Sequence, residues 1–237
     1  MIRLDKYISK AALMTRSTSQ SAIKRGRVTV NGVIAKSGDM KLDEKNAQVC
    51  LDGEKLEYSE FVYIMLNKPA GVLSATEDGK GETVIDLLPE AYANTDVFPV
   101  GRLDKDTVGL MLITDNGPLA HKMLSPKHHV DKTYYLKSEK PISESDRKKI
   151  EKGVYIGEGI TTMPAEFLLD EDAMGGHLTI HEGKFHQVKR MLEAVRNKVV
   201  FLERVKFGTL TLDNALERGK WRKLTKEEEK ILTEKYS

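Results

Sequence analysis

The chain has 237 residues, of which 40% are hydrophobic and 31% are charged, a balance typical of globular proteins. No apolar run approaches the length that spans a bilayer, and the N-terminal residues MIRLDKYISK lack the hydrophobic region of a signal peptide. The one cysteine, Cys50, excludes an internal disulfide and a cysteine-built zinc site, so we expect a cytoplasmic protein without a membrane segment.

Basic residues are concentrated near the N-terminus, although the net charge is only +2. Residues 1–41 contain nine lysines and arginines against two aspartates, so this segment carries a charge of +7 and the remainder a charge of −5. Such a split suggests that one end of the chain binds a polyanion. A solvated basic face without a partner would give the same composition.

Two helices are predicted in this basic segment. Over residues 2–13 the apolar side chains recur at helical spacing, at Leu4, Ile8 and Ala11/Ala12. Ser17 and Gln20 have the spacing of a capping box, which predicts the start of a second helix. Gly26 is suited to the left-handed turn that would end it.

A β-hairpin is predicted next, because Asn31-Gly32 separates the two short β-branched runs 28–30 and 33–35. Four cations gather around the second helix, and like charges on one short element repel each other. We therefore expect an anionic partner for Arg16, Lys24, Arg25 and Arg27.

The segment TRSTSQSAIKRGRVTVNGVIAKSG resembles the small RNA-binding module, or αL motif, that is named after ribosomal protein S-four. The resemblance covers roughly the first quarter of the chain and implies that residues 1–58 bind structured RNA. Such modules occur in ribosomal proteins, synthetases and modification enzymes alike, so the module does not indicate a reaction. The RNA contacts expected here are Arg3, Lys6, Arg16, Lys24, Arg25 and Arg27.

A polar connector places a domain boundary near residues 56–60, followed by a second domain of residues 59–237. Strand-like and helical stretches mix there without a strict βαβ repeat or a glycine-rich phosphate loop. Thr225 and Glu228 have the spacing of a capping box for the last helix. We therefore predict an α+β protein, with a small helix–helix–hairpin domain and a larger domain whose mixed, mostly antiparallel sheet is flanked by helices. The expected strands are 61–66, 97–100, 110–114, 133–137, 177–181 and 199–202, and the expected helices are 119–125, 144–152 and 185–195.

The segment FPVGRLDKDTVGLMLIT places a polar loop between two apolar strands. In that loop Asp104 lies between Arg102 and Lys105, so neighbouring positive charge would keep its carboxylate ionised. An ionised carboxylate suits a nucleophile or a charge stabiliser. Loop aspartates are more often turn formers or surface ion pairs, and Asp106 is an equal candidate by local chemistry.

GRLDKDTVGLMLIT resembles the signature loop of RNA pseudouridine synthases, in the branch that modifies ribosomal RNA. Two further segments agree in the expected order, LNKPAG at 66–71 and HEGKFHQVKRML at 181–192. With the RNA-binding module in front, the resemblance covers essentially the whole chain. It implies that Asp104 is the catalytic aspartate.

The resemblance also implies the partners of that aspartate. Lys189 stands where many members of the family have an arginine paired with the aspartate, although a lysine lacks the two-pronged geometry of a guanidinium. Arg190 is the alternative. In the segment KTYY, Tyr134 is expected to lie against the target base, while strand alternation turns Tyr135 to the other face. The substrate pocket is expected to contain Arg102, Leu103, Thr107, Leu202, Asn67 and Lys68.

A second basic patch lies between residues 184 and 206, where seven lysines and arginines face only two glutamates. Phosphate contacts dominate nucleic-acid affinity, so two separated cationic surfaces could clamp one RNA. For Arg196 and Lys198, the solvated face of an amphipathic helix is an equally good interpretation. The RNA contacts expected from this patch are Lys184, His186, Gln187 and Arg190.

Forming pseudouridine breaks an N-glycosidic bond, turns the base and rejoins it through carbon. Nothing is oxidised and no group is imported, so we expect no cofactor, and the six histidines show no metal-ligand spacing. The target would leave its stack to enter the site. Asp104 would then attack the ribose C1′ or abstract a neighbouring proton, Lys189 would neutralise it, and Tyr134 would help to remove the C5 proton.

The wording HQVKRM resembles the branch that acts on one uridine of 16S ribosomal RNA, which predicts a small-subunit assembly intermediate as partner and a monomeric enzyme. Large-subunit relatives more often read RQIRRM, so a 23S enzyme is the alternative. A non-catalytic ribosome-assembly factor would explain the RNA-binding module alone. A glycoside hydrolase using Asp104 and Asp106 is disfavoured, because residues two apart seldom span the required carboxylate separation.

Overall fold

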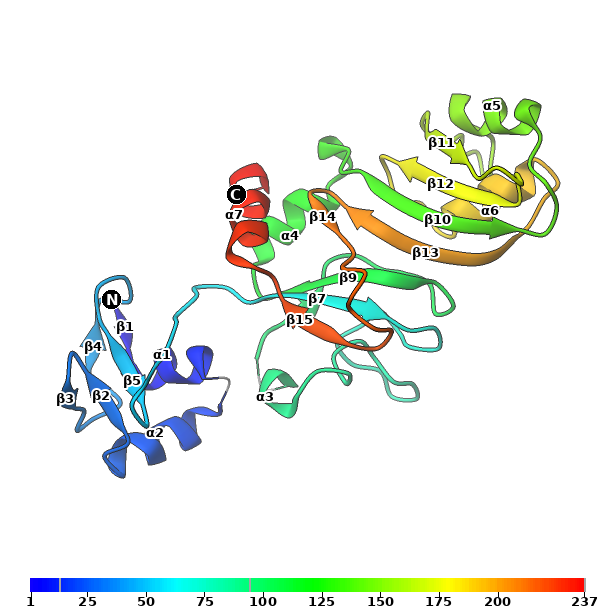
Figure 1. Ribbon diagram of the computed structural model, residues 1–237. Helices are drawn as coiled ribbons and strands as arrows, with labels where there is room; N and C mark the ends of the chain where they lie inside the picture. Colours follow the sequence, from blue (N-terminus) through cyan, green and yellow to red (C-terminus); the bar gives the residue numbers. More distant parts are fainter. Residues whose placement is uncertain (13, 94, 237) are drawn as a thin grey trace. The chain divides into compact units, whose positions relative to one another are not determined.

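The computed structural model describes residues 1–12, 14–93 and 95–236, and the chain forms two compact units (Figure 1). Unit 1 contains residues 1–62 and 88–96, and unit 2 contains residues 63–87 and the chain from residue 97 onward. Within the described ranges, no helix is long and apolar enough to cross a membrane.

Unit 1 has the predicted helix, helix and hairpin. A core that includes Leu4, Ile8 and Ile23 joins the helices to the strands. Asn31 and Gly32 both have positive φ, 51° and 80°, as a two-residue hairpin turn requires. The first predicted helix ran to residue 13, which lies outside the described residues. The elements are β1 (Ile2–Arg3), α1 (Leu4–Ala11), α2 (Arg16–Lys24), β2 (Val28–Val30), β3 (Val33–Ile34), β4 (Lys41–Leu42), β5 (Val49–Leu51), β6 (Glu54–Lys55) and α3 (Glu90–Ala93).

The start of α2 differs from the prediction. The helix is capped by Thr15, whose hydroxyl accepts a hydrogen bond from the backbone N–H of Thr18 at 3.1 Å. The side chain of Gln20 donates instead to Asp5 at 3.2 Å. The predicted Ser17–Gln20 capping box is therefore wrong, because the helix begins earlier and a buried carboxylate takes the glutamine. Gly26, at φ 72°, follows the last turn as predicted.

Asp5 is a buried charge in unit 1, with 1% of its surface exposed. Its carboxylate accepts hydrogen bonds from the Arg3 guanidinium at 3.0 and 2.6 Å. The bond from Arg3 is the largest influence and, with that from Gln20, lowers the pKa of Asp5 to about 2 despite burial. Folding therefore favours the ionised form of this carboxyl.

We expect the Asp5→Asn variant to lose about 2 kcal/mol of unfolding free energy at neutral pH. The folded pKa of Asp5 is depressed, so its contribution is full above the unfolded value near 4 and disappears as the pH falls toward 2. Denaturant unfolding of both proteins between pH 2 and 6 would measure this, and the two curves should converge at the acid end.

The matched control is Asp39→Asn, which removes an exposed carboxylate that pairs with the same arginine, Arg3, at 2.5 Å. A surface ion pair contributes little, so this variant should unfold almost like the wild type. Equal destabilisation by both substitutions would contradict the assigned role of the buried carboxylate.

Unit 2 is built on a nine-stranded sheet in the order β11-β12-β10-β13-β9-β7-β15, with β14 beside β13 and β8 beside β9. Among the described residues, β9 and β13 form the one parallel pair of this sheet and the other pairs are antiparallel. This confirms the predicted α+β class. The strands are β7 (Tyr63–Lys68), β8 (Phe98–Pro99), β9 (Val108–Thr114), β10 (Lys132–Ser138), β11 (Glu166–Leu169), β12 (Gly175–Ile180), β13 (Val199–Phe207), β14 (Leu210–Thr211) and β15 (Trp221–Lys223).

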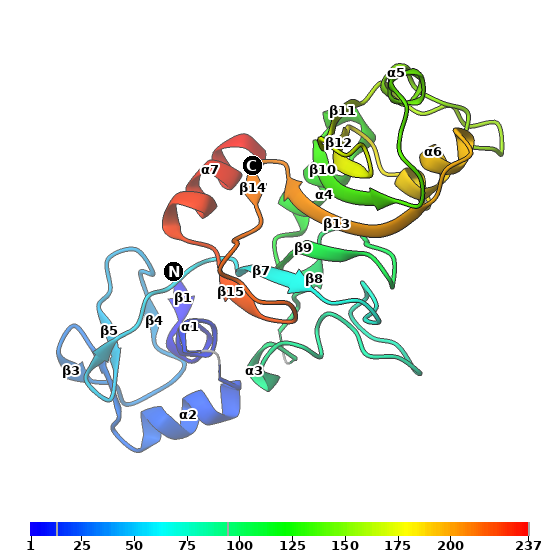
Figure 2. The same ribbon diagram turned by 45° about the vertical axis from the view of Figure 1, so that its right-hand side comes forward.

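Helices flank this sheet, with α5 against β11 and α6 against β13, while α4 and α7 contact each other (Figure 2). The predicted capping box of α7 is confirmed, because the Thr225 N–H donates to Glu228 at 2.7 Å and the Glu228 N–H donates to Thr225 at 3.2 Å. The helices are α4 (Gly117–Leu124), a 3-10 turn η1 (Pro126–His128), α5 (Glu144–Lys152), α6 (Gln187–Ala194) and α7 (Lys226–Tyr236).

The strand order brings distant segments together. β13 lies between β10 and β9, and the register aligns Tyr134 with Arg204 and Arg204 with Gly109. Gly109 has φ 101°, and a Cβ there would lie 2.4 Å from the carbonyl oxygen of Arg204. Only glycine allows this approach of β9 to β13.

Candidate active site

The loop that carries Asp104 connects β8 to β9. A buried lysine, Lys68, donates hydrogen bonds to the backbone of this loop. Lys68, at the end of β7, has no exposed surface. Its ammonium group donates to the carbonyl oxygen of Asp104 at 3.1 Å, and also to those of Pro69, Lys105 and Thr107 at 3.1, 3.3 and 2.9 Å. Burial lowers the pKa of Lys68 to about 8, although the carboxylates of Asp106 and Asp104 oppose the shift.

Two further contacts hold the same loop. The Ser74 hydroxyl donates to the carbonyl of Leu103 at 2.8 Å and accepts from the N–H of Leu103 at 3.0 Å. The N–H of Gly71 donates to the carbonyl of Lys105 at 2.8 Å. The backbone is thus held on both sides of Asp104, which limits where its carboxylate can point.

The carboxylate of Asp104 contacts the Lys189 ammonium group from α6 and the His186 imidazole from the turn before it. The ammonium group of Lys189 lies 2.9 Å from Oδ2 of Asp104 and 2.6 Å from Oδ1 of Asp106. Nε2 of His186 lies 3.5 Å from Oδ1 of Asp104. Burial disfavours the ammonium, but the hydrogen bonds with Asp106 and Asp104 outweigh it and raise the pKa of Lys189. Lys189 therefore stays charged beside both carboxylates.

Arg190, the alternative partner of Asp104, turns away from it. Its guanidinium donates to the carbonyls of Ile156 at 2.8 Å and Phe185 at 3.2 Å, and it pairs with Glu158 at 3.2 Å. The interpretation of Arg190 as the partner of Asp104 is therefore wrong. These bonds also occupy much of the guanidinium that was expected to contact RNA.

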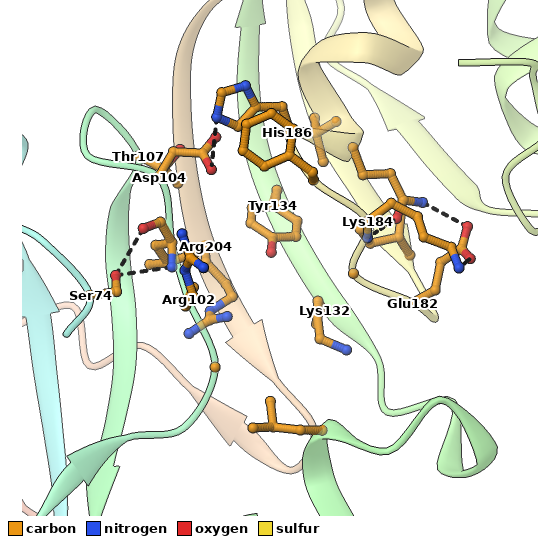
Figure 3. A pocket seen from close by; sticks show the side chains of 18 of the residues that line it. Ser74, Arg102, Asp104, Thr107, Lys132, Tyr134, Glu182, Lys184, His186 and Arg204 are labelled. Carbon is orange, nitrogen blue, oxygen red and sulfur yellow. Dashed lines mark hydrogen bonds and ion pairs between the residues drawn. The ribbon is translucent and has the colours of Figure 1, made fainter. Parts of the chain in front are cut away.

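A cavity of about 1020 Å³ opens beside Asp104 (Figure 3). The predicted catalytic and pocket residues that line it are Arg102, Leu103, Asp104, Thr107, Tyr134, Lys189 and Leu202, and the predicted RNA contacts that line it are Lys184, His186 and Gln187. The side chain of Asp104 is 26% exposed and that of Asp106 is 73% exposed, so Asp104 is the more enclosed of the two carboxylates.

Two predicted pocket residues, Asn67 and Lys68, do not line this cavity. The amide of Asn67 donates to the carbonyl of Leu216 at 2.7 Å and accepts from Arg218. Lys68 lies beneath the loop and contacts its backbone, as described above. Their prediction as pocket residues is therefore wrong, because the end of β7 supports the loop without facing the cavity.

Two basic residues that were not predicted as pocket residues, Arg204 and Lys132, also line the cavity. Arg204 is 2% exposed, and its guanidinium donates to the carbonyl of Leu110 at 2.8 Å and lies 4.6 Å from the ring centre of Phe207. Lys132 donates to the carbonyl of Val130 at 2.8 Å, and burial lowers its pKa to about 8. In the described part of the chain, neither has a carboxylate within ion-pair distance.

Tyr134 and Tyr135 lie on opposite faces of β10, as predicted. Tyr134 is buried against the cavity, and this burial raises the pKa of its hydroxyl, while the Arg204 guanidinium opposes part of the shift. Tyr135 donates a hydrogen bond to Asp170 at 3.2 Å and its ring lies 5.2 Å from that of His177. Tyr134 is therefore a neutral phenol at the cavity wall.

The predicted RNA contacts differ in how available they are. Gln187 is 4% exposed, and its side chain accepts from the Lys184 N–H at 2.9 Å and donates to Glu182 at 2.9 Å. Gln187 lines the cavity, but its amide holds the turn before α6, so its contact with RNA stays a prediction. Lys184 and His186 remain partly exposed at the cavity.

In unit 1 the cations fall into two groups. Arg3 pairs with Asp5 and Asp39, and Arg27 pairs with Asp52, so their charges are offset. The other predicted cations are exposed and form no ion pair with any residue that the structure describes: Lys6, Arg16, Lys24 and Arg25.

The fold and the aspartate–lysine pair at the cavity are those of a candidate active site, and comparisons with known proteins identify its family. Residues 62–194 match the RNA pseudouridylate synthase family model, and residues 2–49 match the S4 domain. The chain belongs to the RNA pseudouridine synthase family and is an RNA pseudouridine synthase. Within the described residues, no group of three histidine, cysteine or carboxylate side chains is placed to hold a metal ion.

Similar proteins match along nearly the whole chain. An RNA pseudouridine synthase from Bacillus subtilis, YtzG, is 44% identical, and the match covers 98% of this chain and 99% of that protein. Ribosomal small subunit pseudouridine synthase A from Vibrio cholerae is 42% identical, with coverage of 96% and 97%. A crystal structure of a pseudouridylate synthase aligns with a TM-score of 0.68 at 38% identity, covering 98% of this chain and 100% of that one.

We expect the Lys68→Met variant to lose roughly 100-fold in turnover, because the loop would no longer place the carboxylate within about an ångström of its working position. Single-turnover release of tritium from RNA labelled at uridine C5 would measure the loss. RNA affinity should be little changed, since Lys68 does not line the cavity.

Lys80→Met is the matched control, because Lys80 is an exposed lysine in the same unit. It should retain wild-type turnover. Turnover of the Lys68→Met variant within about twofold of the wild type would contradict the assigned role of the buried ammonium.

Proposed function

We propose that the chain converts one uridine of 16S ribosomal RNA to pseudouridine, with Asp104 acting on the ribose of a flipped-out nucleotide. The observation that supports this most is the position of the Asp104 carboxylate, enclosed at a cavity and 2.9 Å from the Lys189 ammonium. The cavity, about 1020 Å³, can take one extruded nucleotide.

In this proposal Asp104 either attacks C1′ or abstracts a neighbouring proton, and both routes need an ionised carboxylate. Lys189 pairs with the carboxylate and holds its orientation. On either route the C1′–N1 bond breaks and the bonding electrons leave with the uracil. The detached base can then turn in the cavity and bond to C1′ through C5. On the first route this displaces the Asp104 carboxylate from C1′, and on the second route the abstracted proton returns to the ribose. The proton on C5 is then lost and N1 takes up a proton.

In this proposal Tyr134 binds the uracil base by stacking. Its ring forms part of the cavity wall, and its raised pKa keeps the phenol neutral while the base stacks on it. Arg204 lies beside it and stabilises negative charge. A neutral phenol is not a base, so Tyr134 would help to remove the C5 proton in the last step only as its phenolate, whose charge the Arg204 guanidinium would offset.

We propose further that residues 1–58 bind the RNA and residues 59–237 perform the reaction. The S4 domain match and the exposed cations Lys6, Arg16, Lys24 and Arg25 support the first role. The names of similar proteins, ribosomal small subunit pseudouridine synthase A, support ribosomal RNA as the substrate. The proposal places a monomeric enzyme in the cytoplasm, acting on a small-subunit assembly intermediate without a cofactor.

We expect Asp104→Asn to abolish product while RNA binding is retained, because the amide preserves the shape of the side chain but removes its charge. The matched variant is Asp106→Asn, which removes the neighbouring carboxylate on the same lysine. It should keep turnover within about tenfold of the wild type, the range of general electrostatic effects at partly exposed sites. Tritium release and filter binding on transcripts of 16S RNA would measure both.

Turnover of the Asp104→Asn variant near that of the wild type would contradict the assignment of Asp104 as the catalytic carboxylate. If Asp106→Asn then lost all turnover, Asp106 would be the catalytic carboxylate instead.

The RNA target requires a separate measurement. Pseudouridines in 16S and 23S RNA can be mapped by their reaction with carbodiimide in a strain from which the gene is deleted. We expect one pseudouridine to be lost from 16S RNA and to return when the wild-type gene is restored. Loss of a site from 23S RNA instead would overturn the choice of substrate and leave the reaction unaffected.

A further inference from the structure

An exposed pair of aromatic rings stands at the rim of the cavity. Phe185 is 69% exposed, and its ring stacks on the imidazole of His186 with centroids 3.8 Å apart and planes 18° apart. Both residues line the cavity, and Figure 3 shows His186 above Asp104. A phenylalanine this exposed at a cavity rim leaves most of its apolar surface in water without a protein partner.

The backbone of His186 adopts an unfavourable conformation that sets the position of its ring. His186 has φ 50° and ψ 32°, a left-handed conformation that is unfavourable for a residue with a side chain. That conformation places the imidazole between the Phe185 ring and the carboxylate of Asp104, 3.5 Å from Nε2. The two rings and the carboxylate therefore follow one another toward the reacting centre.

Hydrogen bonds hold the turn before α6, which carries Phe185 and His186. Gln187 accepts from the N–H of Lys184 at 2.9 Å and donates to Glu182 at 2.9 Å. Glu182 in turn accepts from the N–H of Met163 at 2.8 Å. Arg190 donates to the carbonyl of Phe185 itself at 3.2 Å. The backbone that carries the exposed ring is thus held in place by hydrogen bonds within the protein.

We propose that the open face of Phe185, opposite His186, binds the nucleobase adjacent to the target uridine by stacking. Extrusion of the target leaves its neighbours without one of their stacking partners, and unpaired RNA bases commonly stack on aromatic side chains. The exposed Lys184 is next to Phe185 in the sequence, and although its ammonium group lies 3.7 Å from Glu182, it suits a phosphate that flanks such a base. This inference rests on the proposed function, and it makes Phe185 a specificity-determining residue for the nucleotide beside the target.

The test is a double-mutant cycle between the protein and the RNA. The proteins are the wild type, Phe185→Ala and Phe185→Trp, and the RNAs are a 16S fragment containing the mapped target and two versions with an abasic nucleotide on its 5′ or 3′ side. Loss of a base–aromatic stack corresponds to roughly a 5- to 150-fold weaker affinity. Phe185→Ala should weaken binding of the intact RNA by that factor, with single-turnover kcat changed less than threefold, and Phe185→Trp should restore it.

On one of the abasic RNAs the difference between the wild type and Phe185→Ala should disappear, and that RNA identifies the side on which the base stacks. Leu168→Ala is the control, because Leu168 is equally exposed, at 72%, but lies on β11 and does not line the cavity. It should bind all three RNAs like the wild type.

The inference is overturned if Phe185→Ala binds the intact RNA normally, as it would if this ring served a protein partner. It is also overturned if the substitution weakens binding equally on all three RNAs, because the ring would then support the turn without contacting a neighbouring base. Failure of the proposed function looks different, since the wild-type protein would then form no pseudouridine in the intact fragment.

Discussion

The ammonium group of Lys68 is the contact on which the active-site loop depends. It is fully buried, and it replaces water with four backbone carbonyls, three of which belong to the loop that carries Asp104. A buried charge is tolerated only when hydrogen bonds compensate its desolvation, so the loop cannot move far without a large energetic cost. Lys189 then acts on the outer side of the same loop by pairing with the Asp104 carboxylate. Lys68 therefore holds the backbone of the loop, and Lys189 pairs with the carboxylate that the loop carries.

The sheet order explains why residues about a hundred positions apart form one cavity. β13 lies between β10 and β9, so Tyr134, Arg204 and the end of the Asp104 loop occupy neighbouring strands. Gly109 makes this possible, because a side chain there would collide with the backbone of β13. The exposed rings of Phe185 and His186 extend the cavity outward along the turn before α6. The cavity thus combines a cationic floor, an enclosed carboxylate and an aromatic rim, a combination suited to an extruded nucleotide and its neighbour.

Sequence reasoning succeeded where the signal is local. The Asn31-Gly32 turn, the Thr225–Glu228 capping box and the strand alternation at Tyr134 depend on a few adjacent residues, and the structure confirms them. Predictions from the sequence were wrong where a residue distant in the chain determines which contacts a side chain makes. Gln20 matched a capping box but bonds to Asp5, and Lys68 stands in the expected segment but points beneath the loop. The burial of Arg204, the partial burial of Lys132, the short strands β11 and β15, and the exposure of Phe185 likewise follow from long-range packing that periodicity does not report.

The central claim is that the Asp104 carboxylate acts directly on the ribose of the target nucleotide. A crystal structure of the Asp104→Asn variant with a 16S fragment bound would locate that ribose. The account predicts C1′ within about 3.5 Å of the side chain at position 104, with the uracil ring against Tyr134. A target ribose bound outside the cavity, with Lys189 and His186 between it and position 104, would contradict the account.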